Sequence, residues 1–125
     1  MTQRRILIVD DEDDIREVAQ VSLELVGNYE VLTAASGRDG LERARSGRPD
    51  AILLDVMMPD MDGPSTLAEL RRDPATRDIP VVFLTAKTQS AERTRLAELG
   101  AAGILTKPFD PLKLAGEVAA TLQWS

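Results

Sequence analysis

The sequence predicts an α/β fold in which one parallel β-sheet is covered by helices on both faces. Three continuous apolar runs, at residues 6–9, 51–54 and 81–84, do not alternate with polar residues, which is typical of strands buried on both faces. A weaker strand at residues 30–34 and a brief one at 104–106 complete a set of five. Segments with helical spacing separate them. This alternation implies five strand–helix units, with parallel strands joined by right-handed crossovers.

The first helix follows the strand at residues 6–9. Gly27 and Asn28 provide a common type of C-terminal stop. We expect the acidic residues 12–14 to cap this helix and to complement its dipole. Its predicted apolar face consists of Ile15, Val18, Ala19, Ser22, Leu25 and Val26.

The second and third helices have recognisable start signals. Ser36 can cap the second helix through its hydroxyl, with Asp39 three residues further on. Gly63 and Pro64 open the third helix, which must end before Pro74.

The last two helices complete the alternating pattern. The fourth is expected from about Ser90 to Leu99, ahead of Gly100, and the fifth from Pro111. We expect Trp124 to pack on the fifth helix. Apolar residues of the fifth helix at helical spacing are Leu112, Ala115, Val118, Ala119 and Leu122.

The length of 125 residues fits one domain, so we expect a single domain over residues 1–125 and no effector domain in this chain. No apolar run approaches the roughly 18–20 residues that a membrane-spanning helix needs. The N-terminus lacks the apolar core of a secretory signal. These features predict a cytoplasmic protein.

Composition narrows the possible chemistry. The chain has no Cys and no His, which excludes disulfides, thiolate nucleophiles, imidazole bases and zinc sites built on those ligands. Carboxylates, lysines and hydroxyls remain, and these suit hard cations and phosphoryl groups. The net charge of −6 repels polyanions, so we expect no direct binding of nucleic acid.

Polar residues follow the ends of the predicted strands. Asp10 and Asp11 follow the first run, Asp55 the third, Thr85 the fourth and Lys107 the short fifth strand. Ligands of open α/β sheets bind at this edge. Three carboxylates so close together repel one another, and a divalent cation relieves the repulsion. We expect Mg²⁺, with Mn²⁺ as a possible substitute.

Asp55 is the central carboxylate, and it can attack phosphorus to form an aspartyl phosphate. Lys107 and the metal would bind the phosphoryl oxygens. The hydroxyl of Thr85 and the backbone N–H of Ala86 would donate hydrogen bonds to them. The sequence therefore predicts a phosphoryl pocket.

These residues also occur in a recognisable set of motifs. Over the whole chain and in order, the sequence resembles the receiver domain of two-component response regulators, particularly the stand-alone, chemotaxis-regulator-like type. The motifs that carry the resemblance are Val9-Asp10-Asp11, Asp55 with Val56-Met57-Met58-Pro59 and Met61-Asp62-Gly63, Thr85-Ala86, and Thr106-Lys107-Pro108-Phe109.

The resemblance implies a flavodoxin-like sheet with the strand order 2-1-3-4-5. It also implies that Asp55 accepts a phosphoryl group from a histidine kinase or phosphotransfer protein. The implied Mg²⁺ ligands are Asp11, Asp55 and the backbone carbonyl of Met57, with Asp10 acting through water. In such domains the Lys107-Pro108 bond is often cis.

A conformational switch is implied as well. Thr85 is drawn to the phosphoryl group and Lys107 pairs with it, which remodels the face formed by the fourth helix, the fifth strand and the fifth helix. This face would bind a downstream protein, in a monomer or a weak homodimer. Ile104 departs from the family, whose members usually carry Tyr or Phe there. Met57 and Lys87 occupy positions that influence phosphate lifetime in the family.

Two alternatives to the phosphorylation switch stay open at this point. The first is a phosphorylation-independent interaction module, for which the departure at Ile104 is the motivation. The second is a small aspartyl-phosphate phosphatase. It has less support, since Met57 rather than a second acid stands two residues after Asp55 and no cap domain fits in the chain.

Overall fold

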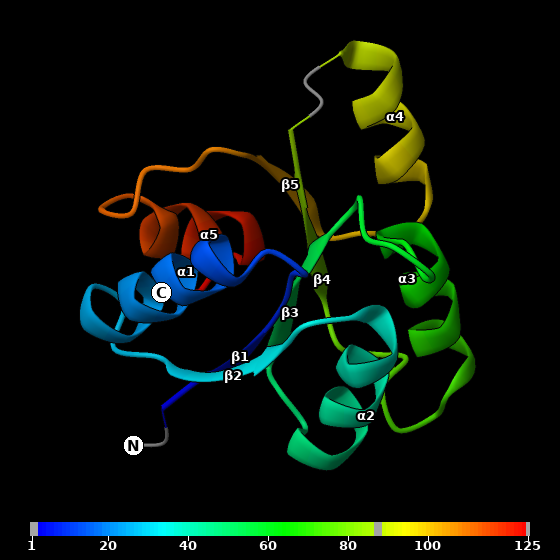
Figure 1. Cartoon of the computed structure of the whole chain (residues 1–125), viewed down its shortest axis with the longest axis horizontal. Coiled ribbons are helices and arrows are strands. Elements are labelled where there is room, and N and C mark those ends of the chain that lie inside the picture. Colours follow the sequence, from blue (N-terminus) through cyan, green and yellow to red (C-terminus); the bar gives the residue numbers. More distant parts are fainter. Residues whose placement is uncertain (1–2, 87–88, 125) are drawn as a thin grey trace.

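The computed structural model describes residues 3–86 and 89–124 and has five parallel strands that alternate with helices (Figure 1). The sheet order β2-β1-β3-β4-β5 confirms the predicted order 2-1-3-4-5. The strands are β1 (Arg5–Val9), β2 (Glu30–Ala34), β3 (Ala51–Asp55), β4 (Val81–Thr85) and β5 (Gly103–Thr106). The helices are α1 (Asp13–Leu25), α2 (Gly37–Gly47), α3 (Gly63–Arg72), α4 (Ser90–Glu98) and α5 (Leu114–Leu122).

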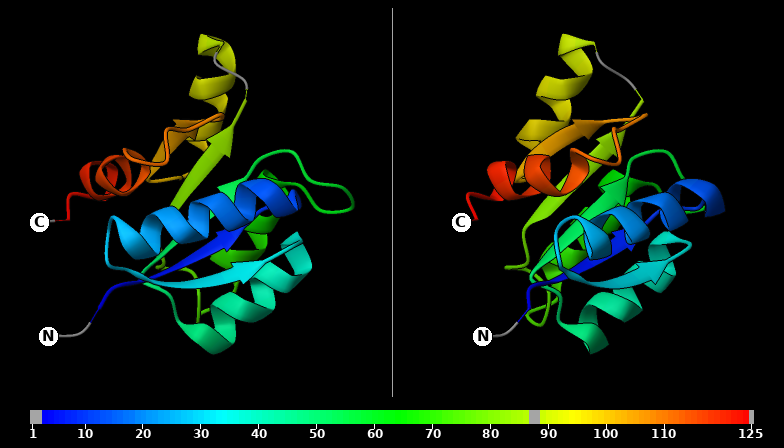
Figure 2. Two further views of the ribbon diagram at one scale, coloured as in Figure 1. Left: turned by 60° about the vertical axis from the view of Figure 1, so that its left-hand side comes forward. Right: turned by 90° about the vertical axis from the view of Figure 1, so that its left-hand side faces the viewer.

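Helices cover both faces of the sheet, as predicted. α1 and α5 lie on one face, and α2, α3 and α4 lie on the other (Figures 1 and 2). Each face has its own apolar core, because side chains of successive strand residues point to opposite sides. Ile6 and Ile8 face α1 and α5, whereas Leu7 and Val9 belong to the core under the other helices. Every residue of β3 and β4 is buried.

Strand register aligns the carboxyl ends of the four strands that carry candidate site residues. Val9 pairs with Leu54, so Asp10 follows β1 beside the end of β3. Thr85 pairs with Thr106, and the N–H of Lys107 donates to the Thr85 carbonyl at 2.9 Å. The sheet thus brings residues from distant parts of the sequence to one edge.

The predicted starts of α2, α3 and α4 are confirmed, because Ser36 caps α2, α3 begins at Gly63 and α4 begins at Ser90. The Ser36 hydroxyl accepts the Asp39 N–H at 3.1 Å, and Asp62 caps α3 by accepting the Ser65 N–H at 2.8 Å. The predicted side-chain cap of α1 is wrong. Glu12 occupies the N-cap position without a side-chain capping bond, because its carboxylate reaches Lys107 instead.

The predicted apolar face of α1 needs correction. The residues that α1 buries are Ala19, Ser22 and Leu23, while Leu25 is 80% exposed. Val18 and Val26 are also exposed. α1 therefore has two adjacent apolar stripes. Ala19 and Leu23 belong to the buried stripe, which contacts the sheet, and Val18 and Leu25 belong to the exposed stripe. The predicted face combined residues of both stripes and omitted Leu23, because periodicity alone does not show which stripe meets the sheet.

The predicted start of α5 at Pro111 is also wrong, since the helix begins at Leu114. The Asp110 carboxylate accepts the Leu112 N–H at 2.9 Å, and the Asp110 carbonyl accepts the N–H of Leu114 at 3.0 Å. These bonds form a turn before the helix, and Leu112 is 77% exposed rather than part of a buried face.

Trp124 is partly buried against the core on the α5 side, as predicted. Its ring lies 5.6 Å from the Tyr29 ring, and the Arg4 guanidinium lies 4.4 Å from its centroid. Among residues 3–86 and 89–124, no helix has the length and apolar character required to cross a membrane.

Candidate functional site

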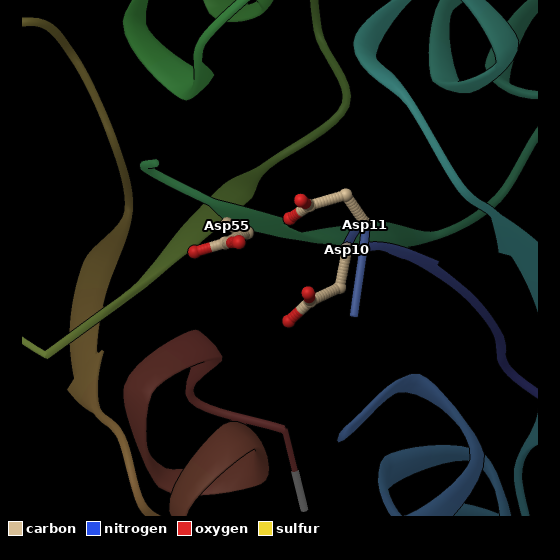
Figure 3. Close-up of side chains that lie close together, drawn as sticks. All are labelled: Asp10, Asp11 and Asp55. Atoms are coloured by element: carbon tan, nitrogen blue, oxygen red, sulfur yellow. The ribbon is translucent and has the colours of Figure 1, made fainter. Parts of the chain in front are cut away.

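Three carboxylates meet at the carboxyl edge of the sheet. Asp10 and Asp11 follow β1, and Asp55 is the last residue of β3 (Figure 3). Each offers one oxygen, and these oxygens lie within 4.8 Å of one another. Asp10 and Asp55 are buried, while Asp11 is partly exposed. The structure therefore brings together the predicted acidic cluster.

Backbone and side-chain hydrogen bonds fix Asp10 in place. Its N–H donates to the Ala34 carbonyl of β2 at 3.1 Å, and one carboxylate oxygen accepts the Glu12 N–H at 2.9 Å. The Arg16 guanidinium donates to the Asp10 carbonyl at 2.8 Å. Sequence reasoning missed this role of Arg16, because nothing in its spacing indicates a contact with a backbone carbonyl.

Lys107 reaches the carboxylates from the end of β5. Its ammonium lies 3.0 Å from Asp10 and 3.3 Å from Asp55, and the Lys107 side chain is only 8% exposed. A third carboxylate, that of Glu12, lies 3.4 Å away. An ammonium has three N–H donors, so these three acids can accept all of them.

Burial and the charge of Asp10 raise the pKa of Asp55 from its usual 3.8 to about 6. Lys107 and the backbone N–H of Met57 act in the opposite direction, since they stabilise the carboxylate. Burial disfavours the Lys107 ammonium, but the carboxylates of Asp10 and Asp55 outweigh this effect and raise the pKa of Lys107. The site thus holds excess negative charge that Lys107 alone does not neutralise.

Close backbone packing positions the loop after Asp55. The Gly63 N–H donates to the Val56 carbonyl at 2.9 Å. A Cβ at Gly63 would lie 2.5 Å from the Asp55 carbonyl oxygen, closer than atoms can approach. Gly63 is therefore required next to Asp55 as well as at the start of α3. The sequence suggested only its role in the helix start.

The Asp55 carboxylate opens into a pocket of about 280 Å³. Thr85 is buried at the end of β4, while Ala86 is exposed beside the pocket. Met57 is 63% exposed. Lys87 lies outside the described residues. The residues lining the pocket are Glu12, Ile15, Asp55, Met57, Ala86, Lys107 and Pro108.

The donor set fits Mg²⁺. Carboxylate oxygens are the ligands that this hard cation prefers, and it needs few of them because it keeps several waters. The fit is supported by the raised pKa of Asp55, since a cation would offset the repulsion from Asp10. The open pocket leaves room for a further anionic ligand above Asp55.

Two other predicted features lie near this edge. The Lys107-Pro108 peptide bond is cis. Ile104 is partly buried against the core beneath α2, α3 and α4, and it pairs with Phe83 of β4. Its aliphatic side chain carries no hydroxyl that could bind a partner.

Comparisons with known proteins give a consistent result. The family model of the response regulator receiver domain matches residues 6–119. The chain is 39% identical over 122 residues to the alkaline phosphatase synthesis transcriptional regulatory protein PhoP of Bacillus subtilis, covering 98% of this chain and 50% of that protein. It is 41% identical over 123 residues to the phosphate regulon transcriptional regulatory protein PhoB of Pseudomonas aeruginosa, covering 98% and 53%.

The fold matches solved structures along nearly the whole chain. The chemotaxis response regulator CheY4 of Vibrio cholerae superposes with a TM-score of 0.89 at 34% identity, covering 96% of this chain and 99% of that one. The present chain spans about half the length of the curated relatives it matches. The strand order, the acidic edge and these similarities together show that the chain belongs to the response regulator receiver domain family.

Proposed function

We propose that this receiver domain is a phosphorylation-activated switch in which Asp55 accepts the phosphoryl group. The geometry around Asp55 is the main support for this proposal. Asp55 lies at an open pocket with a buried ammonium 3.3 Å from its carboxylate and two further acids close by. A nucleophile, a cation for the phosphoryl oxygens and a set of metal ligands are the parts that phosphoryl transfer needs.

In the proposed step, a carboxylate oxygen of Asp55 attacks phosphorus. A P–O bond to Asp55 forms while the P–N bond of a phosphohistidine, or the P–O bond of an acyl phosphate, breaks. The leaving group keeps the electron pair, and a leaving imidazole takes up a proton. Lys107 stabilises charge on the phosphoryl oxygens, and Thr85 and the N–H of Ala86 donate hydrogen bonds to them.

Asp11, Asp55 and the backbone carbonyl of Met57 would hold Mg²⁺, with Asp10 acting through water. Bound there, the cation supplies positive charge that favours the carboxylates and attracts phosphoryl oxygens. Asp10 also has a role of its own in the proposal, since it holds the Lys107 ammonium at 3.0 Å.

The phosphodonor in the proposal is a histidine kinase or a phosphotransfer protein, since residues 1–125 contain no His that could carry the phosphoryl group. A chain of apolar hollows supports a docking path for it. The pocket at Asp55 shares Ile15 and Pro108 with a second hollow, which shares Val18 with a third of about 370 Å³. This third hollow is lined by the exposed stripe of α1, including Leu25, and by Leu112.

Acidic residues line this path. Asp14 and Glu17 lie beside the two outer hollows, and no described lining residue of those hollows is basic. A donor helix with an apolar face and basic flanks would therefore be complementary to the path. Such a helix, lying along α1, would bring a phosphohistidine to Asp55.

The output surface in the proposal is the face of α4, β5 and α5. Leu96 is the buried residue of α4, and this helix projects from the rest of the domain (Figures 1 and 2). A helix with so few buried side chains can shift with little loss of packing. The downstream protein would bind here. The cytoplasmic location and the monomer or weak homodimer stay predictions from the sequence.

The packing of Ile104 favours a second candidate, a constitutive interaction module. Ile104 is already partly buried against the core and lacks an aromatic ring that could move with Thr85. Affinity for a target that is equal in wild type and Asp55→Asn would favour this candidate. Affinity that rises on phosphorylation would exclude it.

Incubation with Mg²⁺ and acetyl phosphate, followed by intact-mass measurement, tests the proposed acceptor. We expect one phosphoryl increment on wild type, which disappears with a chelator or in Asp55→Asn. Failure of wild type to gain the increment would contradict the proposal. Steady turnover of generic phosphomonoesters would instead favour a phosphatase.

A further inference from the structure

Glu12 is the exposed member of the three carboxylates around Lys107. Its side chain is 60% exposed, whereas those of Asp10 and Asp55 are 0% and 4% exposed. Its distance to the Lys107 ammonium, 3.4 Å, is the longest of the three. An exposed carboxylate that leaves Lys107 is solvated by water, so its release costs little free energy. A buried carboxylate has no water to replace the lost contact, so its release costs more.

The position of Glu12 is not explained by the start of α1. A carboxylate at the N-cap normally accepts a backbone N–H of the first helical turn. The Glu12 side chain makes no such bond and lies beside the pocket at Asp55. Its backbone N–H donates to Asp10, which fixes the backbone of Glu12 while the side chain extends to Lys107.

We propose that the Glu12 carboxylate is a displaceable partner of Lys107, which slows the entry of anionic phosphodonors and leaves Lys107 when the phosphoryl group forms. This inference rests on the proposed function of Asp55. The Lys107 ammonium donates to Asp10 and Glu12 and lies 3.3 Å from Asp55, so a phosphoryl oxygen can bind it only in place of one of these carboxylates. One acid must release Lys107, and the exposed Glu12 is the one whose release costs least.

The same carboxylate also acts by its charge. Phosphodonors are anions, and Lys107 is the only basic residue among the described residues that line the pocket. A negative charge at the pocket entrance opposes their approach. Both effects lower the affinity of the site for the phosphodonor. Neither changes the rate of the phosphoryl transfer that follows binding.

The test compares phosphorylation by acetyl phosphate at saturating Mg²⁺ in wild type, Glu12→Gln and Glu24→Gln. Glu24 is exposed near the other end of α1, so its substitution removes the same charge from the same helix far from the site. Intact mass gives the second-order rate constant, kphos/KS. We expect Glu12→Gln to raise it about two- to fivefold, the range for a partly exposed ion pair, and Glu24→Gln to leave it unchanged.

A second readout separates donor binding from general structural effects. Affinity for beryllofluoride, measured by calorimetry at saturating Mg²⁺, should rise in Glu12→Gln by a similar factor, and both gains should shrink in high salt. Glu12→Asp keeps the charge, but its shorter side chain does not reach Lys107. Its kphos/KS and its affinity for beryllofluoride should therefore lie between those of wild type and Glu12→Gln.

Three results would overturn the inference. They are an unchanged or lower kphos/KS in Glu12→Gln, an equal gain in Glu24→Gln, or a Glu12→Asp variant indistinguishable from wild type. Phosphorylation of the wild-type protein in the same experiment tests the proposed function separately. Failure of wild type to accept phosphoryl would contradict the role of Asp55, whereas wild-type phosphorylation with no effect of Glu12 would overturn only this inference.

Discussion

The ammonium of Lys107 lies 3.0 Å from the carboxylate of Asp10, although 97 residues separate them in the sequence. Both side chains are buried, with 8% and 0% of their surfaces exposed. A buried ion pair is costly to break by removing one partner, because the other charge loses its compensation. This pair therefore connects the stability of the domain to its chemistry.

We predict that Lys107→Met lowers the free energy of unfolding by about 3 kcal/mol without metal, because it leaves buried carboxylates unpaired. Mg²⁺ should recover part of the loss. Lys113→Met is the matched control, since Lys113 is exposed and should change stability by less than about 0.5 kcal/mol. Urea denaturation measures both, and equal effects of the two substitutions would contradict the importance of the buried pair.

The raised pKa of Asp55 predicts a pH dependence of stability in the absence of metal. Between pH 3.8 and about 6 the unfolded chain loses the Asp55 proton while the folded protein keeps it. The contribution of Asp55 to the free energy of unfolding therefore falls as the pH rises from 3.8 to about 6. Asp55→Asn should be more stable than wild type by about 2 kcal/mol at pH 8 and about equal at pH 4.

Denaturation of both proteins at these two pH values, with a chelator present, measures the difference. Mg²⁺ at pH 8 should reduce it, because the cation compensates the Asp55 charge in wild type. An advantage of Asp55→Asn that is the same at pH 4 and pH 8 would show that ionisation of Asp55 is not its cause.

Close packing of Gly63 against Asp55 predicts a strong effect of a single methyl group. Gly63→Ala should lower stability by about 1–3 kcal/mol, the usual cost of an overpacked site, and slow phosphorylation by acetyl phosphate. Gly116→Ala offers the opposite case, because a Cβ there meets open space within α5. It should raise stability by about 0.5–1 kcal/mol. Similar effects of both substitutions would refute the role of Gly63.

The two stripes of α1 predict different roles for neighbouring leucines. Leu23 is fully buried, so Leu23→Ala should cost about 2–5 kcal/mol of stability. Leu25 is 80% exposed, and Leu25→Ala should change stability by no more than about 0.5 kcal/mol. If a donor helix binds along α1, Leu25→Ala should also slow phosphoryl transfer from a histidine kinase but not from acetyl phosphate.

A panel of autophosphorylated histidine kinases provides this measurement, with any kinase that phosphorylates wild type as the donor. Loss of transfer from the kinase together with unchanged reaction with acetyl phosphate supports docking on α1. Equal rates for wild type and Leu25→Ala with every such kinase would exclude Leu25 from the docking surface.

Most of the fold and the acidic edge could be predicted from sequence. Buried parallel strands appear as continuous apolar runs, and the residue after each run lies at one edge of the sheet. This places Asp10, Asp55, Thr85 and Lys107 together. The prediction needs only the order of elements, not the packing of side chains.

Other features depend on tertiary packing and had no local signal. The buried face of α1 depends on which apolar stripe meets the sheet, so Leu23 was missed and Leu25 was misplaced. Glu12 was assigned to a helix cap because that role is local. Its contact with Lys107 joins residues 95 positions apart. The contact between Gly63 and Asp55 likewise requires the folded loop.

Mapping of the modified residue distinguishes Asp55 from the other acids of the site. Wild type would be treated with Mg²⁺ and acetyl phosphate, reduced with borohydride to convert an aspartyl phosphate to homoserine, and mapped by peptide mass spectrometry. If Asp55 is the phosphoacceptor, we expect homoserine at position 55 and at no other aspartate. Homoserine at Asp10 or Asp11 instead, or phosphorylation that persists in Asp55→Asn, would contradict it.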